Sequence, residues 1–123
     1  MKIERFEDIE GWKSARELCK MIYKITADFG HNYGLKDQIQ RAAVSIMANI
    51  AEGFDTGSHL EFKRFLVFSM RSASEVHSHL YVALDQQYIS EEEFRLIYRK
   101  IVENKNLIYG FIRYLKSAAR KSV

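Results

Sequence analysis

Residues 42–51 read Ala-Ala-Val-Ser-Ile-Met-Ala-Asn-Ile-Ala, a run without a single charged side chain. A helix that is apolar nearly all round is normally buried on several sides, whereas each helix of a monomeric bundle shows one face to water. Gly34 and Gly53 bound this stretch, and glycine often marks a helix end. We therefore predict a helix over residues 35–53 that packs against helices of this chain and of a second copy.

Three amphipathic segments surround this helix. Apolar side chains recur at steps of three and four over residues 8–29, 58–86 and 90–119, as the buried face of a helix requires. The chain contains no proline, so few residues interrupt long helices. Connections of about four to six residues make consecutive helices antiparallel. The sequence predicts one all-α domain over residues 1–123, an antiparallel up-down-up-down four-helix bundle.

The last two helices have the clearest predicted starts. Ser58 is followed three residues later by Glu61, and Ser90 is followed in the same way by Glu93. In such a capping box the serine hydroxyl accepts a hydrogen bond from an early backbone N–H, and the glutamate reaches back to the N–H of the serine. We expect both pairs to form complete capping boxes.

Composition and charge narrow the class of protein. Lys and Arg total 19 against 16 Asp and Glu, a net charge of +3 that does not by itself imply an anionic partner. The single cysteine, Cys19, excludes an intrachain disulfide and suits a reducing compartment. The opening residues lack the apolar core of a signal peptide, and the longest uncharged run is far shorter than a membrane span. We expect a cytoplasmic protein without membrane contact.

The sequence contains no pattern that indicates catalysis, a metal or a cofactor. Di-metal sites in bundles need a histidine three residues after a glutamate, and none of the histidines has that spacing: His31, His59, His77 and His79. No phosphate-binding loop or nucleophile elbow is present. We expect no enzymatic activity, no metal and no cofactor.

One polar stripe runs along the otherwise apolar second helix. Arg41, Ser45, Asn49 and Glu52 follow one another at steps of four, four and three, which places them on one face. The stripe is either a ligand or partner site, or a hydrogen-bonded network that fixes helix register or subunit orientation. Asn104, among the apolar positions of the last helix, invites the same structural interpretation. An enzyme cleft beside this stripe is a third alternative, but it lacks a nucleophile or a metal.

The last helix carries the second polar feature, a basic row with an interleaved tyrosine. Its members are Arg95, Arg99, Asn106, Tyr109, Arg113, Lys116 and Arg120. Their spacings sum to whole helical turns, so they share one face. Such a face suits phosphate contacts and stacking on unpaired bases of RNA or DNA. The alternative is an ordinary solvated face, with cations near the negative end of the helix dipole.

Residues 38–54 carry a family resemblance. They read Gln-Ile-Gln-Arg-Ala-Ala-Val-Ser-Ile-Met-Ala-Asn-Ile-Ala-Glu-Gly-Phe, which closely resembles the signature of the bacterial four helix bundle proteins, also called 23S rRNA intervening-sequence proteins. The similarity covers the whole chain, including the Phe6-Glu-Asp-Ile9 opening and Trp12. It implies a bundle that assembles as a homo-oligomeric ring, commonly a homopentamer, without known catalysis. A related protein is the accessory factor of diversity-generating retroelements, whose basic pentamer surface is thought to engage reverse transcriptase and nucleic acid.

Two functional hypotheses follow. The first is a non-enzymatic homo-oligomer that binds RNA or DNA through the basic surface of its last helix. The alternative is a protein–protein interaction scaffold without nucleic-acid binding, whose projecting helix ends hold a protein partner.

Overall fold

Four α-helices form the chain between residues 3 and 121, the part that the computed structural model describes; side chains are described as far as residue 118. The helices are α1 Glu10–Thr26, α2 Tyr33–Asp55, α3 His59–Asp85 and α4 Glu91–Lys121, and a short 3-10 helix, Phe6–Asp8, precedes them. No strand occurs within residues 3–121. The predicted all-α four-helix bundle is confirmed, and the predicted helix ends differ from these by one to three residues.

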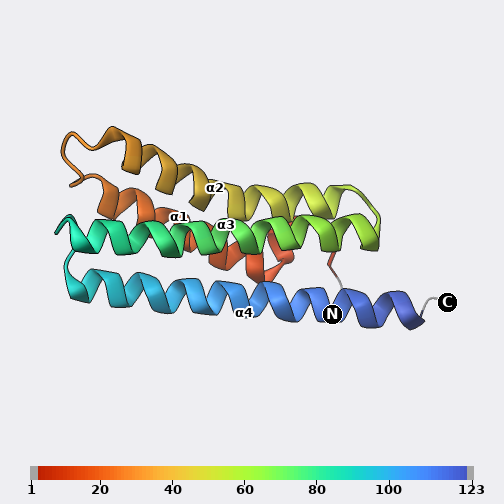
Figure 1. The fold of residues 1–123 in the computed structure, drawn as a ribbon. Helices are drawn as coiled ribbons and strands as arrows, with labels where there is room; N and C mark the ends of the chain where they lie inside the picture. Colours follow the sequence, from red (N-terminus) through yellow and green to blue (C-terminus); the bar gives the residue numbers. More distant parts are fainter. Residues whose placement is uncertain (1–2, 122–123) are drawn as a thin grey trace.

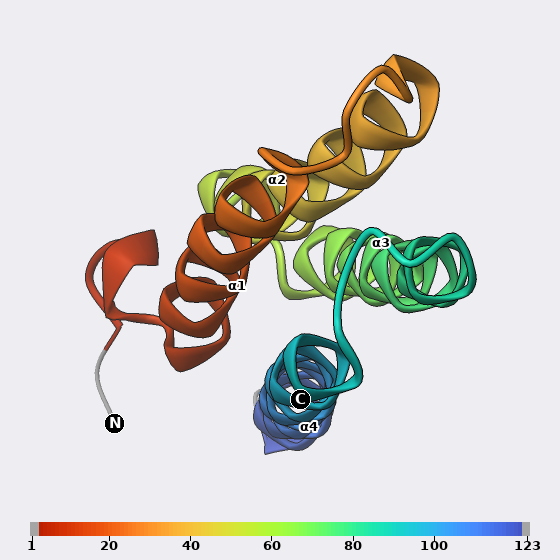
Figure 2. The ribbon, with the colours of Figure 1, turned by 90° about the vertical axis from the view of Figure 1, so that its left-hand side faces the viewer.

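The helices form an antiparallel bundle in which each helix packs against two of the other three. α1 packs against α2 and α4, and α3 packs against the same two helices, so α1 and α3 are not neighbours. Figure 1 shows that the first half of α2 leans away from α3, whereas its second half runs alongside α3. Figure 2 shows the same slant from the end of the bundle, with α3 and α4 seen nearly end-on. The outer face of α2 is therefore left without a helix of this chain over it.

α4 is the longest element. Its 31 residues correspond to about 46 Å, and the 23 residues of α2 to about 35 Å. The C-terminal end of α4 extends beyond the connection between α2 and α3 (Figure 1). The C-terminal part of α4 is therefore exposed to solvent on more sides than the part that packs against α1 and α3.

The core is built mainly from aliphatic side chains of the four helices, to which Ile9 and Phe29 are added from the segments on either side of α1. The largest fully buried ones are Phe29, Ile9, Leu18, Ile22, Ile39, Ile46, Ile50, Leu66, Leu80, Ile97, Ile101 and Ile108. Each contributes roughly 1.5–3 kcal/mol when it leaves water. Because this core runs the length of the bundle, it holds the outer faces of the helices in fixed positions.

The connection between α1 and α2 differs from the prediction. α1 ends at Thr26 rather than at residue 29, because Phe29 turns into the core, where its ring centroid lies 5.1 Å from that of Tyr88. Gly30 follows with a φ of +59°, which is the left-handed region that glycine adopts readily. Asn32 then caps α2 by accepting a hydrogen bond from the N–H of Leu35, at 3.2 Å.

One of the two predicted capping boxes is complete. At the start of α4, the N–H of Ser90 donates to Glu93 Oε1 at 2.8 Å, and the N–H of Glu93 donates to Ser90 Oγ at 3.0 Å. At the start of α3, the N–H of Glu61 donates to Ser58 Oγ at 3.2 Å. The return bond predicted there is wrong, since the N–H of Ser58 donates instead to Thr56 Oγ1 at 3.3 Å.

Candidate functional site

The predicted basic row lies on one exposed face of α4. Arg95, Arg99, Arg113 and Lys116 are all exposed, as is Asn106 between them. Arg120 belongs to the same helix, but its side chain lies outside the described part of the chain. The spacing thus predicted the shared face correctly, because α4 continues unbroken through all of these positions.

Tyr109 and Arg113 form the most ordered part of this face. The guanidinium carbon of Arg113 lies 4.9 Å from the centroid of the Tyr109 ring, and Tyr109 is 51% exposed. A guanidinium within about 6 Å of an aromatic ring is attracted to the ring face. The contact holds a cation and an exposed ring side by side, which is a suitable arrangement for a phosphate and its neighbouring base.

The acidic residues of α4 do not neutralise the centre of this face. Glu91, Glu92 and Glu93 lie in its first turn, where Glu91 Oε2 is 3.8 Å from Arg95 Nη1. The other acid, Glu103, lies 3.5 Å from Lys100 Nζ. For the described part of the helix after Glu103, every charged side chain is basic. The described second half of α4 therefore has no acidic side chain of its own, and Glu10 of α1, which lies beside Asn106 and Gly110, is paired with Lys13.

Lys100 joins α4 to α1 through an ion pair. Its Nζ lies 2.6 Å from Glu17 Oε2. The hydrogen bond from Lys100, followed by the attraction of its charge, lowers the pKa of Glu17. Burial disfavours the charge on Lys100, but the hydrogen bond with Glu17 and the charge of Glu103 outweigh burial and raise the pKa of Lys100. Lys100 is thus a structural cation and not part of the basic face.

The predicted polar stripe lines a groove of about 490 Å³ on the outer side of α2. Its walls are Tyr23, Asp37, Gln40, Arg41, Val44, Ser45, Ala48, Asn49 and Glu52. Val44 is 41% exposed within it. Residues 42–51, predicted to be covered on several sides, thus have one open side in the single chain.

Two members of the stripe are bound into the contact between α2 and α3. Asn49 Nδ2 donates to the carbonyl of Ser45 at 2.8 Å and to its Oγ at 2.9 Å. The hydroxyl of Ser72 in α3 donates to the same Ser45 Oγ at 2.8 Å. For Ser45 and Asn49 this geometry favours the structural interpretation, a network that fixes α2 against α3.

The other two members of the stripe face outward. Arg41 Nε lies 2.9 Å from Asp37 Oδ2, one turn earlier on α2. Glu52 is exposed at the other end of the groove. These charges leave the middle of the groove to Val44 and Ala48, which are apolar and small.

Close packing of α2 on α3 explains the small residues in the signature stretch. The hydroxyl of Ser69 donates to the carbonyl of Ile46 at 2.7 Å, which requires the two backbones to approach closely. A methyl group added at Gly53 would lie 2.8 Å from Phe62 Cδ1 and 2.8 Å from Phe65 Cβ. Gly53 is therefore a packing requirement as well as a helix-end signal.

Asn104 links α4 to α1 in the core. Its amide nitrogen donates to the carbonyl of Gly11 at 3.1 Å, and the side chain is fully buried. Its Oδ1 has no hydrogen-bond partner among the described residues. This contact supports the register interpretation of Asn104 within one chain.

An aromatic cluster between α3 and α4 was missed by the sequence analysis. The ring of His77 lies 4.9 Å from that of Tyr98, and the ring of Tyr81 lies 4.9 Å from that of Phe94. The pairs His77/Tyr81 and Phe94/Tyr98 are each four residues apart, a spacing that places both members on one helix face. That spacing was the available signal, but only the pairing of α3 with α4 brings the two faces together.

The described residues contain no cluster of three or more His, Cys, Asp or Glu side chains that could hold a metal ion. Cys19 is half-buried, and burial raises the pKa of its thiol. A thiol with a raised pKa is a weak nucleophile at neutral pH. Within residues 3–121, no helix is both long enough and apolar enough to span a bilayer.

The geometry defines a class of protein: a small helical bundle with a basic outer face on α4 and an open polar groove on α2. Residues 7–110 match the family described as 23S rRNA-intervening sequence protein, and the chain belongs to that family. A solved structure from Bacteroides thetaiotaomicron, a protein of unknown function from the S23 ribosomal protein family, is 25% identical. The match covers 83% of this chain and 97% of that one, with a TM-score of 0.76. No curated protein matches this chain.

Proposed function

We propose that the protein is a non-enzymatic homo-oligomer that binds RNA or DNA through the basic face of α4. The observation that carries this proposal is the acid-free second half of α4, where Arg113 stacks on the exposed ring of Tyr109. Cations placed along a helix attract the phosphate backbone, and release of counterions from the nucleic acid drives binding. The family description, which refers to an intervening sequence of 23S rRNA, agrees with an RNA partner.

Self-association brings together the positive charge of several copies, which nucleic-acid binding requires. A net charge of +3 is small for a nucleic-acid-binding domain. Several copies in a ring would bind one strand at several points, so weak contacts would add up to a useful affinity. The open groove on α2 supports this part of the proposal, because Val44 and Ala48 are uncovered there. The family resemblance favours five copies.

Fluorescence anisotropy across a salt series tests the nucleic-acid part. We expect the protein to bind labelled structured RNA or single-stranded DNA at low salt. Replacing Arg99, Arg113 and Lys116 together by alanine should weaken binding and reduce the steepness of its salt dependence by about one unit per lost phosphate contact.

A matched variant controls for total charge. Lys13, Lys20 and Lys24 are exposed on α1, so their replacement by alanine removes the same charge from a different helix. This control should retain most of the binding. Equal losses in the two triple variants, or no binding by the unaltered protein, would refute the α4 interface.

The alternative function is a protein-interaction scaffold. The specific observation in its favour is the end of α4, which projects beyond the rest of the bundle (Figure 1). A scaffold would retain a defined protein partner in pull-downs after nuclease treatment. The nucleic-acid proposal predicts that nuclease releases whatever the protein has retained.

A further inference from the structure

The aromatic cluster of His77, Tyr81, Phe94 and Tyr98 forms a partly exposed surface along the seam between α3 and α4. Tyr81 is 48% exposed and Tyr98 is 38% exposed. Single exposed tyrosines are common on protein surfaces. Here the two tyrosines are joined by the ring of His77, whose centroid lies 5.5 Å from Tyr81 and 4.9 Å from Tyr98. They therefore form one continuous aromatic surface across two helices.

This surface is neutral. One ring nitrogen of His77, Nε2, is buried without a hydrogen-bond partner among the described residues. Burial, followed by the positive charge of Lys105, lowers the pKa of His77. The histidine ring is thus uncharged at neutral pH and contributes an aromatic face rather than a cation.

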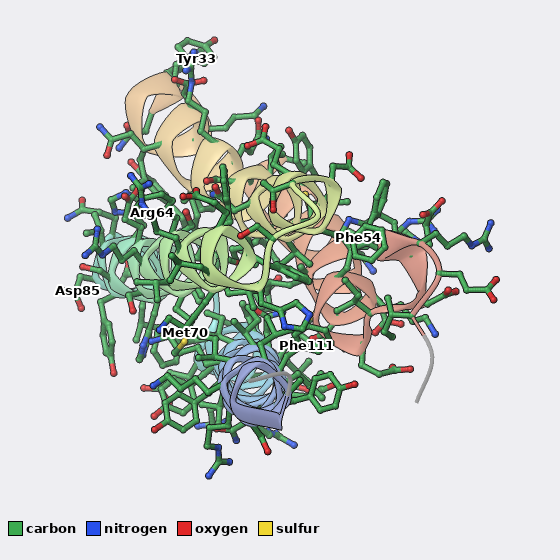
Figure 3. All side chains as sticks on the ribbon, turned by 90° about the vertical axis from the view of Figure 1, so that its right-hand side faces the viewer. Tyr33, Phe54, Arg64, Met70, Asp85 and Phe111 are labelled. Carbon is green, nitrogen blue, oxygen red and sulfur yellow. The ribbon has the colours of Figure 1, made fainter. Side chains whose placement is uncertain are left out.

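Positive charge lies next to the aromatic surface. Arg95 and Arg99 are exposed on either side of Tyr98 along α4, and Lys105 is close enough to influence His77. Glu75 precedes His77 by two residues, so it points to nearly the opposite side of α3. In Figure 3, Met70, two turns before His77, lies on the α4 side of α3, whereas Arg64 lies toward α2. The aromatic surface is therefore flanked by the exposed cation Arg99 and by Lys105, whereas at its other end Arg95 is paired with Glu91 at 3.8 Å and Asp85 lies one turn beyond Tyr81.

We infer that this seam binds unpaired bases, so that the nucleic acid engaged by the protein is single-stranded. The inference rests on the proposed function and names its substrate class. Bases of a single strand can stack on Tyr81 and Tyr98 while α4 cations hold the phosphates. In a duplex the base faces are already stacked on one another, so the rings have nothing to contact. Attraction between the cations and the phosphates alone would not favour a single strand over a duplex in this way.

The strand runs along α4 from the aromatic surface toward Arg113. Tyr98 and Arg113 are about 22 Å apart along the helix axis, which lies within the reach of a strand of the length that such surfaces bind, about 4–16 nucleotides. Tyr109, which stacks against Arg113, lies on this path. The aromatic surface and the basic face therefore lie one after the other along α4, so that a single strand can contact both.

The test compares a labelled oligouridine or oligothymidine of about 16 nucleotides with a duplex of the same length, by fluorescence anisotropy at one salt concentration. The variants are Tyr81→Leu and the double variant Tyr81→Leu/Tyr98→Leu. The double variant Tyr81→Phe/Tyr98→Phe keeps the rings and removes only the hydroxyls. Tyr33→Leu is a control, since Tyr33 is exposed at the start of α2, across the bundle from α4 (Figure 3). Thermal unfolding monitored by circular dichroism verifies that each variant is folded.

We expect the double leucine variant to bind the single strand at least about tenfold more weakly, because it loses stacked bases. The single Tyr81→Leu variant should show part of that loss, and Tyr81 is exposed enough for this variant to keep the fold. The double phenylalanine variant and Tyr33→Leu should bind as the unaltered protein does. Duplex affinity should not change with either leucine variant.

Equal affinity of the unaltered protein for single strand and duplex, or leucine variants that bind the single strand normally, would overturn the inference while leaving the basic-face proposal standing. Absence of binding to both probes would refute the proposed function itself. A protein retained after nuclease treatment, and lost in the leucine variants, would show that the seam is a protein-docking surface and would also overturn the inference.

Discussion

The hydroxyl of Ser72 in α3 donates a hydrogen bond to the hydroxyl of Ser45 in α2, with 2.8 Å between the two oxygens. Ser45 also accepts from the amide of Asn49. One oxygen of the predicted polar stripe thus ties two helices together, while the outer side of the same helix lines an open groove. Ser45 and Asn49 therefore form the structural side of the stripe, toward α3, and Arg41 and Glu52 form its solvent-facing side.

Ser72→Ala should destabilise the protein by about 1 kcal/mol, since Ser45 and Asn49 lose part of a half-buried hydrogen-bond network. Urea unfolding at equilibrium measures this change. Ser74→Ala is the matched control, because Ser74 is exposed on the same helix and should change stability by less than about 0.5 kcal/mol. An equal effect of the two substitutions would contradict a structural role for the stripe.

Gly53→Ala and Gly110→Ala should change stability in opposite directions. A methyl group at Gly53 would overlap Phe62 and Phe65, whereas one at Gly110 meets no atom within 4 Å. Overpacking costs about 1–3 kcal/mol, while alanine in an open helical position gains about 0.5–1 kcal/mol over glycine. Thermal or urea unfolding measures both. Stabilisation by Gly53→Ala would contradict the close contact of Gly53 with Phe62 and Phe65.

The Glu17–Lys100 pair should stabilise the bundle only over a defined pH range. The pKa of Glu17 is lowered from its usual 4.5, so its contribution is complete above that value and is lost as pH falls through the lowered pKa. The pKa of Lys100 is raised from its usual 10.5, so its contribution is complete below that value and is lost as pH rises through the raised pKa.

The difference in Tm between the unaltered protein and Glu17→Gln should therefore be largest near neutral pH and should shrink in strong acid and strong base. Scanning calorimetry across pH measures it. Glu75→Gln, at an exposed position on α3, removes the same charge without removing the partner of Lys100 and is the matched control. A Tm difference for Glu17→Gln that stays constant into acid would contradict the ion pair.

Val44→Glu should break the proposed assembly without unfolding the chain. Val44 is 41% exposed in the groove on α2, so a charge is tolerated in the monomer but is costly in an apolar subunit contact. Light scattering from a sizing column should change from a large species, about 72 kDa for five 14.4 kDa chains, to a species near the mass of one chain.

Val67→Glu is the control for the assembly experiment. Val67 is 38% exposed on α3 and is not one of the residues that line the groove. It should leave the large species intact. An unaltered protein that elutes as a single chain, or a Val44→Glu variant that stays assembled, would exclude the α2 groove as the subunit contact.

The helices could be predicted because the signals that define them are local. Serine caps, glycines and apolar steps of three and four act within one or two turns, so Ser90 with Glu93 marked the start of α4. The basic face of α4 was predictable for the same reason. In a continuous helix, the number of residues between two side chains determines whether they lie on the same face. The prediction was wrong where a nearby group competed, as Thr56 does for the N–H of Ser58.

By itself, the sequence determined the four helices, their antiparallel order and the face on which Arg99, Arg113 and Lys116 lie, since each follows from helical periodicity and short connections. Only the tertiary structure decided which faces meet. It placed His77 against Tyr98 and Ser72 against Ser45, and it left Val44 uncovered. The physical reason is that the rotation and tilt of one helix against another depend on contacts between side chains far apart in the chain. A local sequence pattern cannot predict those contacts.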